Sequence, residues 1–86
     1  MNKIFSDKAW EAYTNWMNED KKILKRINEL IKDIDRNGYK GLGKPEALRH
    51  NLSGYWSRRI NDEHRLIYSI DGENIFILSC KYHYNK

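Results

Sequence analysis

The feature that most restricts the fold of this chain is an apolar stripe between residues 23 and 34. Apolar side chains recur there at the i, i+3, i+4, i+7 spacing of a helix that buries one face. The stripe consists of Ile23, Leu24, Ile27, Leu30, Ile31 and Ile34. Asp20 is placed to cap this helix, and Asn37 and Gly38 end it because both tolerate a left-handed backbone. Such a helix needs a second layer of structure to cover its apolar face.

The residues before the stripe predict a short strand and a first helix. Residues 2–5 suit the strand, and Ser6 can cap a helix over residues 7–18 with Asp7 in its first turn. Large side chains recur in this helix at helical spacing, and we expect them to pack in the core. They are Trp10, Tyr13, Trp16 and Met17.

The second half of the chain predicts strands. Residues 39–46 form a loop, because they hold two glycines and the only proline. Residues 47–53 fit either a short strand or a turn. Asp71 and Gly72 predict a tight hairpin, and short turns force antiparallel pairing. The expected strands are residues 55–60, 64–70 and 74–82.

The resulting order, β-α-α-β-β-β, predicts an α+β fold in which two N-terminal helices pack on a mainly antiparallel sheet. The 86 residues suffice for a single domain, residues 1–86. A domain of this size buries only about 60% of the surface of its unfolded chain. We therefore expect an active site in a shallow groove on the sheet or between elements.

Side chains alternate between the two faces of a strand, which divides the last strand into two sets. We expect one set to pack under the helices: Phe76, Leu78 and Cys80. The other set is Ile75, Ile77, Ser79, Lys81 and His83. Arg65 from the preceding strand is expected on this second face, away from the helices.

The net charge of +4 favours a polyanionic partner such as RNA, DNA, a ribosome or an acidic protein. The alternative is a basic surface that only keeps the protein soluble. The lysines beside the apolar stripe have the same two interpretations: a solvent-exposed helix face, or a basic ridge that contacts phosphates. The single cysteine, Cys80, cannot form an internal disulfide and is expected in the core. With neither a signal peptide nor an apolar segment of transmembrane length, the expected location is the cytoplasm.

Metal-free RNA cleavage needs a base for the 2′-hydroxyl, an acid for the 5′-oxygen and cations for the transition state. Glu46 lies on the Gly/Pro loop, and a histidine such as His83 exchanges protons near neutral pH. The candidate cations are Lys44, Arg49, Arg58, Arg59 and Arg65. None of these residues is specific alone, and His50 and His64 are assigned structural roles. No His-x-x-x-His or Cys-x-x-Cys spacing favours zinc or a two-metal nuclease.

Several stretches together resemble one toxin family. Residues 43–60 read Gly-Lys-Pro-Glu-Ala-Leu-Arg-His-Asn-Leu-Ser-Gly-Tyr-Trp-Ser-Arg-Arg-Ile. Glu-His-Arg-Leu-Ile-Tyr follows at residues 63–68, and Cys-Lys-Tyr-His-Tyr at residues 80–84. With Asn-Glu-Leu-Ile-Lys-Asp at residues 28–33, the chain resembles the YoeB (Txe) branch of the RelE toxin superfamily over essentially its whole length.

This resemblance implies a ribosome-dependent endonuclease that cuts mRNA at the A site, without a metal or another cofactor. It implies that Glu46 is the general base, that His83 is the general acid and that Arg65 stabilises the scissile phosphate. Arg59 and Arg49 would position or neutralise phosphate, and Tyr84 would orient bases. Arg49 stands where a lysine is common in the family, which keeps the charge but changes its geometry. Two residues, Asn85 and Lys86, extend past the point where relatives often stop.

The resemblance also implies partners. A YefM-type antitoxin would neutralise the protein, and the complex would bind operator DNA mostly through the antitoxin. Family members can also be dimeric. Two alternatives remain open here: a non-catalytic toxin on the same fold, like the ParE inhibitors of DNA gyrase, and a regulator that only binds nucleic acid. Neither needs the set Glu46, Arg65 and His83.

Overall fold

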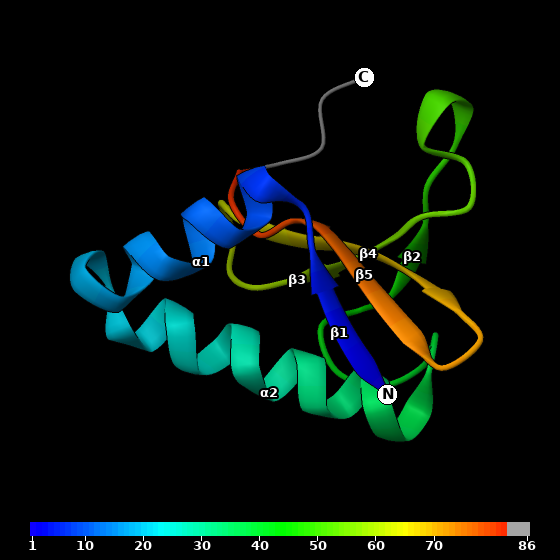
Figure 1. Ribbon diagram of the computed structural model, residues 1–86, viewed down its shortest axis with the longest axis horizontal. Coiled ribbons are helices and arrows are strands. Elements are labelled where there is room, and N and C mark those ends of the chain that lie inside the picture. Colours follow the sequence, from blue (N-terminus) through cyan, green and yellow to red (C-terminus); the bar gives the residue numbers. More distant parts are fainter. Residues whose placement is uncertain (83–86) are drawn as a thin grey trace.

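The computed structural model describes residues 1–82 of the chain. Helices α1 (Asp7–Glu19) and α2 (Lys21–Asn37) follow strand β1 (Asn2–Phe5), and a 3-10 turn, His50–Leu52, follows the short strand β2. The strands after α2 are β2 (Glu46–Ala47), β3 (Trp56–Arg59), β4 (Arg65–Asp71) and β5 (Asn74–Ser79). Figure 1 shows both helices gathered on one side of the sheet and the 3-10 turn on the opposite side of the molecule. The predicted α+β architecture is confirmed, with β2 as an added two-residue strand. It includes Ala47 from the segment that sequence left ambiguous, and Glu46, which was wrongly expected in the loop because only pairing with β3 makes it a strand.

The two helices begin where their caps predict. The Ser6 hydroxyl accepts a hydrogen bond from the amide of Ala9, and the Asp20 carboxylate accepts from the amides of Lys22 and Ile23. Gly38 ends α2 with a φ of 65°, in the left-handed region that glycine adopts without strain. The last four residues of the apolar stripe of α2, Ile27, Leu30, Ile31 and Ile34, are buried in the core, and Ile23 and Leu24 pack against it partly buried.

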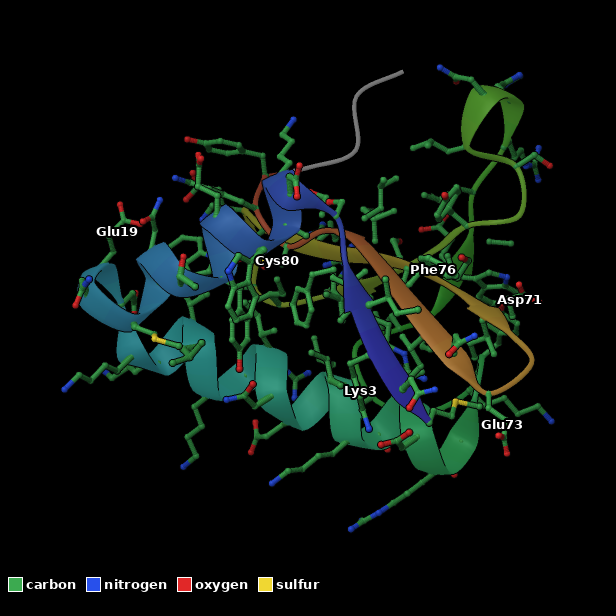
Figure 2. All side chains as sticks on the ribbon, viewed as in Figure 1. Lys3, Glu19, Asp71, Glu73, Phe76 and Cys80 are labelled. Carbon is green, nitrogen blue, oxygen red and sulfur yellow. The ribbon has the colours of Figure 1, made fainter. Side chains whose placement is uncertain are left out.

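The sheet has the strand order β1-β5-β4-β3-β2. Strands β2 to β5 pair antiparallel, whereas β1 pairs with β5 in parallel, with Asn2 opposite Asn74 and Phe5 opposite Ile77. The first and last strands of the chain are therefore neighbours. Lys3 on β1 reaches helix α2, where its ammonium group contacts the Asp35 carboxylate (Figure 2).

The expected division of β5 between the two faces is wrong for its first half. Ile75 and Ile77 are buried under the helices, whereas Phe76 is 39% exposed on the other face. In the register with β4, Ile67 faces Ser79 and Tyr68 faces Ile77, so the strand carries one extra residue between them. A β-bulge of this kind inverts the alternation. Cys80, beyond the bulge, is buried as predicted, and Figure 2 shows it beside α1.

The expectation that all large side chains of α1 pack in the core is also only partly correct. Trp16 is buried and Tyr13 half-buried, but Trp10 is 53% and Met17 43% exposed. Trp10 stacks on Tyr13 at a centroid distance of 5.9 Å rather than entering the core. Among the described residues, neither helix is long and apolar enough to cross a membrane.

Candidate active site on the open face of the sheet

The face of the sheet that the helices leave open carries a row of aligned residues from four strands. Glu46 on β2 lies opposite Ser57 on β3, which lies opposite Ile67 on β4 and then Ser79 on β5. Directly paired residues of a sheet share a face, and neighbouring strands lie about 4.8 Å apart. Ser57 and Ile67 are nearly buried, so they form the floor of this surface, while the Glu46 side chain is exposed at its edge.

Two arginines form the next row on the same face. Arg59 on β3 and Arg65 on β4 are direct register partners. Like charges placed directly opposite one another on a sheet are unfavourable for folding. Within residues 1–82, neither the Arg59 guanidinium nor the Glu46 carboxylate makes an ion pair or hydrogen bond. The pair of arginines thus presents an unneutralised positive charge one strand away from an unpaired carboxylate.

Arg65 differs from Arg59 in that its side chain is held in place. Its Nη1 donates to the carbonyls of Asn61 at 2.7 Å, His64 at 3.1 Å and Asp62 at 3.4 Å. Its backbone amide donates to the carbonyl of Tyr82 at 3.1 Å. The end of the described chain therefore lies against Arg65. All three carbonyls accept from Nη1, so within residues 1–82 the Nε and Nη2 donors of the guanidinium remain for an anion.

Arg58 does not belong to this surface, contrary to its place among the candidate cations. Its side chain is fully buried on the helix-covered face, where Nη1 pairs with Asp33 and Nε donates to the Tyr68 hydroxyl at 3.0 Å. The remaining donors bond the carbonyls of Gly38, Lys40 and Leu42. All five guanidinium donors are thereby used. The apolar residues two positions away, Trp56 and Ile60, are the sequence signal that places Arg58 on the inner face.

These bonds hold the loop that leads to Glu46. The Arg58 guanidinium, together with the bond from the Leu42 amide, keeps the pKa of the Asp33 carboxyl below its usual value, so the pair stays charged. Gly43 lies where an added Cβ would come within 2.9 Å of Leu30, and its φ is 82°. The Gly43 carbonyl accepts from the Arg59 amide at 2.6 Å, which brings the following residue, Lys44, beside Arg59.

The structure does not place the other predicted site residues beside Glu46, Arg59 and Arg65. Arg49 is exposed just before the 3-10 turn, on the arm between β2 and β3 that Figure 1 shows in green at the edge of the molecule. His83 and Tyr84 lie outside the described residues. The structure therefore brings together Glu46, Arg59 and Arg65, with Lys44 adjacent.

Two grooves on the described surface lie on the helical side of the molecule. One of about 570 Å³ includes Met17 and Lys21, another of about 500 Å³ includes Trp10 and Tyr13, and Lys32 lines both. None of the candidate site residues lines either groove. Within residues 1–82, no three His, Cys, Asp or Glu side chains are placed to hold a metal ion. The candidate residues occupy an open surface, which suits a polymer better than a small molecule.

Comparison with known proteins agrees with this architecture. Residues 5–84 match the family model described as the YoeB-like toxin of bacterial type II toxin-antitoxin systems. Toxin YoeB of Escherichia coli (strain K12) is 52% identical over 84 residues, covering 98% of this chain and 100% of the relative.

The chain belongs to the YoeB-like toxins.

Solved structures of YoeB-like toxins share the fold closely. A YoeB dimer and a heterotetrameric YoeB-YefM complex, both from Staphylococcus aureus, each match with a TM-score of 0.92 and 58% identity. In both comparisons the match covers 98% of this chain and 98% of the other. As a YoeB-like toxin, the protein is the toxin component of a type II toxin-antitoxin system.

Sequence reasoning about this YoeB-like toxin missed residues that support the open face. Ser57 and Ile67 form its floor, although neither was a candidate. His64 was assigned a structural role, and its buried side chain does contact the end of the described chain, where Nδ1 accepts from the Tyr82 amide at 2.8 Å. Ile67 belongs to the floor because it pairs with Ser79 across β4 and β5, and this pairing could not be derived from the sequence of either strand alone. Nothing in the sequence indicates the hydrogen bond between His64 and Tyr82.

Proposed function

We propose that this toxin is a ribosome-dependent endoribonuclease that cleaves mRNA at the A site and so stops translation. The observation that carries the proposal is the facing pair Arg59 and Arg65 on the open sheet face, beside the unpaired Glu46. The fold does not need two facing cations on one surface. An RNA phosphate between them would turn their repulsion into attraction.

The proposed chemistry needs no metal or other cofactor. Glu46 takes the proton of the 2′-hydroxyl, and the resulting oxygen attacks the adjacent phosphorus. The bond from phosphorus to the 5′-oxygen breaks, His83 protonates the leaving oxygen, and a 2′,3′-cyclic phosphate remains. A general acid or base contributes roughly 10² to 10⁴ in rate, so two of them support an effective nuclease.

The proposed division of the cations follows their surroundings. Arg65 is held by three backbone carbonyls and contacts the scissile phosphate, where a fixed donor stabilises developing charge without reorganising. Arg59, Lys44 and Arg49 are exposed and bind neighbouring phosphates. Tyr84 orients bases. Glu46 and Arg65 lie two strands and two residues apart, roughly 12 Å between Cα atoms, which long side chains can span around one phosphate.

We further propose a YefM-type antitoxin as the neutralising partner, since the Staphylococcus aureus relative forms such a complex. Acidic and apolar residues of the antitoxin would cover the open face, because its charge is positive and uncompensated. Operator DNA would be contacted mainly by the antitoxin. The protein acts in the cytoplasm, and the free toxin associates into a dimer by analogy with the YoeB dimer of Staphylococcus aureus.

The test is primer extension on a translated reporter message, with and without ribosomes, for wild type, Glu46→Ala and His83→Gln. We expect cuts within codons only when ribosomes translate, and at least about 100-fold slower cleavage by each variant. His50→Gln, on the exposed 3-10 turn, is the matched control and should cleave within about threefold of wild type.

The same preparations separate the alternatives. Strong inhibition of DNA gyrase supercoiling by wild type, without cuts in translated RNA, would replace the nuclease by a ParE-like inhibitor. Binding to ribosomes or RNA without cleavage would instead support a nucleic-acid-binding regulator. If the toxin bound to its antitoxin cut A-site mRNA as fast as free toxin, the proposed covering of the open face would be wrong.

A further inference from the structure

The end of the described chain is held in an unusual backbone conformation. Tyr82 has a φ of 65°, in the left-handed region that residues other than glycine rarely adopt. Both of its backbone polar groups are bonded: the amide donates to His64 Nδ1 at 2.8 Å, and the carbonyl accepts from the Arg65 amide at 3.1 Å. Such a conformation persists only where the surroundings fix it.

His64 provides the side-chain half of this attachment. The residue is only 4% exposed, with its ring against the edge of Trp16 at 4.9 Å and near the ring of Tyr82 at 5.6 Å. Because Nδ1 accepts a hydrogen bond, the ring proton is on Nε2, which lies 3.6 Å from a carboxylate oxygen of Glu63. Packing alone needs no acceptor atom aimed at the Tyr82 amide, so an apolar side chain of similar size would fill the same space.

The segment between β5 and Tyr82 is held by further side chains. The indole of Trp16 donates to the carbonyl of Cys80 at 3.1 Å, and the Ser79 hydroxyl donates to the carbonyl of Lys81 at 3.2 Å. Side chains from α1 and from the end of β5 thus replace a regular ladder at this point. The backbone immediately before residue 83 is specified by contacts with the core.

His64 also contacts Arg65. The His64 carbonyl accepts from Nη1 of Arg65 at 3.1 Å, while its imidazole holds Tyr82. One buried residue therefore touches both the cation placed at the scissile phosphate and the residue that precedes His83 in sequence.

We propose that His64 is a positioning residue for RNA cleavage: its Nδ1 sets the backbone direction at Tyr82 and thereby the position of the acid that follows. This inference rests on the proposed function. Misplacement of a catalytic group by about 1 Å can reduce a rate by about 100-fold. Loss of the acceptor should therefore lower the rate of the chemical step and leave ribosome binding intact.

The test compares two amides that place the acceptor at different positions. In His64→Asn the side-chain oxygen takes the place of Nδ1, whereas in His64→Gln the amide reaches the position of Nε2. We expect His64→Gln to lower single-turnover cleavage at least tenfold, with the half-saturating ribosome concentration within about twofold of wild type. His64→Asn should stay within about threefold.

A purely structural role predicts the reverse order, since glutamine is closer to histidine in volume and leaves the smaller cavity. Rates that are equal in the two variants, or that follow their melting temperatures, would overturn the proposal. Tyr13→Phe is the control for a lost part-buried bond that does not involve the site residues, since the Tyr13 hydroxyl donates to Asn28 at 2.6 Å. Its rate should match wild type.

Hydrogen exchange of the Tyr82 amide tests the contact without using activity. We expect at least tenfold faster exchange in His64→Gln than in His64→Asn, with the Ile60 amide, which bonds the His64 carbonyl, unchanged. If wild type does not cleave RNA at all, the proposed function fails, and the exchange result alone decides whether His64 holds the chain end. Equal exchange in both variants would refute that attachment.

Discussion

Arg58 and Arg59 are neighbours on β3, yet they lie on opposite faces of the sheet in opposite surroundings. Arg58 is fully buried, and all its donors bond Asp33, Tyr68 or loop carbonyls. Arg59 is exposed, and within residues 1–82 its side chain has no partner while another arginine stands opposite. On the covered face, the charge of Arg58 stabilises the fold. On the open face, the charge of Arg59 makes no contact that stabilises the fold. We infer that the open-face charge serves a ligand.

The largest expected effect is on the covered face. Arg58→Met should lower the free energy of unfolding by about 3–5 kcal/mol, because Asp33 is left unpaired and three loop carbonyls lose their donor. Urea unfolding measures the loss. Arg59→Met, its neighbour on the other face, should change stability by no more than about 0.5 kcal/mol. Similar losses for the two variants would remove the distinction between the faces.

The next effect concerns activity on the open face. Arg65→Gln should slow single-turnover cleavage of message on programmed ribosomes by roughly 10² to 10³, equivalent to about 2.7–4 kcal/mol, because a fixed donor at the developing charge is lost. Its stability should fall by about 1.5–3 kcal/mol at most, since the bonds removed are those from the guanidinium to the Asn61, Asp62 and His64 carbonyls at the surface. Cleavage within threefold of wild type would exclude Arg65 from the reaction.

A smaller effect depends on pH. The pKa of Asp33 is lowered in the folded state by Arg58, so its stabilisation is present above the ordinary pKa of 3.8 and is lost as pH falls below that value. Asp33→Asn should cost about 1.5–3 kcal/mol at neutral pH, and the difference from wild type should shrink towards pH 2. Urea unfolding between pH 2 and 7 measures it.

Asp35→Asn is the surface control for this experiment. The pKa of Asp35 is also lowered, first by its bond from Lys3, but the ion pair is exposed and should be weakened by salt. A difference between wild type and Asp33→Asn that stayed constant from pH 7 to pH 2 would contradict a charged Asp33–Arg58 pair.

The smallest effect tests the repulsion on the open face. Arg59→Gln should stabilise the protein by about 0.2–0.5 kcal/mol at low salt, because it removes one of two facing cations. The gain should disappear in 1 M salt, where charges are screened beyond about 3 Å. Loss of stability at low salt would mean that Arg59 takes part in the fold after all.

Local chemistry made most of the architecture predictable. Ser6 and Asp20 cap their helices as expected, and the stripe in α2 sets the covered layer. The bulge between Ile77 and Ser79 was not predictable, because one extra residue is specified by pairing with β4 and not by the local pattern. Short strands such as β2 likewise exist only through their partner, since Glu46 and Ala47 pair with β3 alone.

The sequence predicted those parts of the candidate site that follow from the alternation of side chains between the two faces of a strand. Arg59 and Arg65 share the open face, but Arg58 was wrongly grouped with them because three arginines look alike in composition. Arg59 lies opposite Arg65 only because of the register between β3 and β4. The sequence of one strand does not determine that register. The contact of His64 with Tyr82 joins residues 18 positions apart through a backbone amide, and side-chain patterns carry no information about it.

The parallel pairing of β1 with β5 has a consequence for the order of events during folding. β5 is an inner strand of the sheet, between β1 and β4, yet it follows all the other strands of the described residues in sequence. Until it is in place, β1 has no strand to pair with and the helices have only part of a sheet to cover. Contacts between chain ends form late because the intervening loop must close first. We therefore expect the sheet to be completed late in folding, when β5 pairs with both β1 and β4.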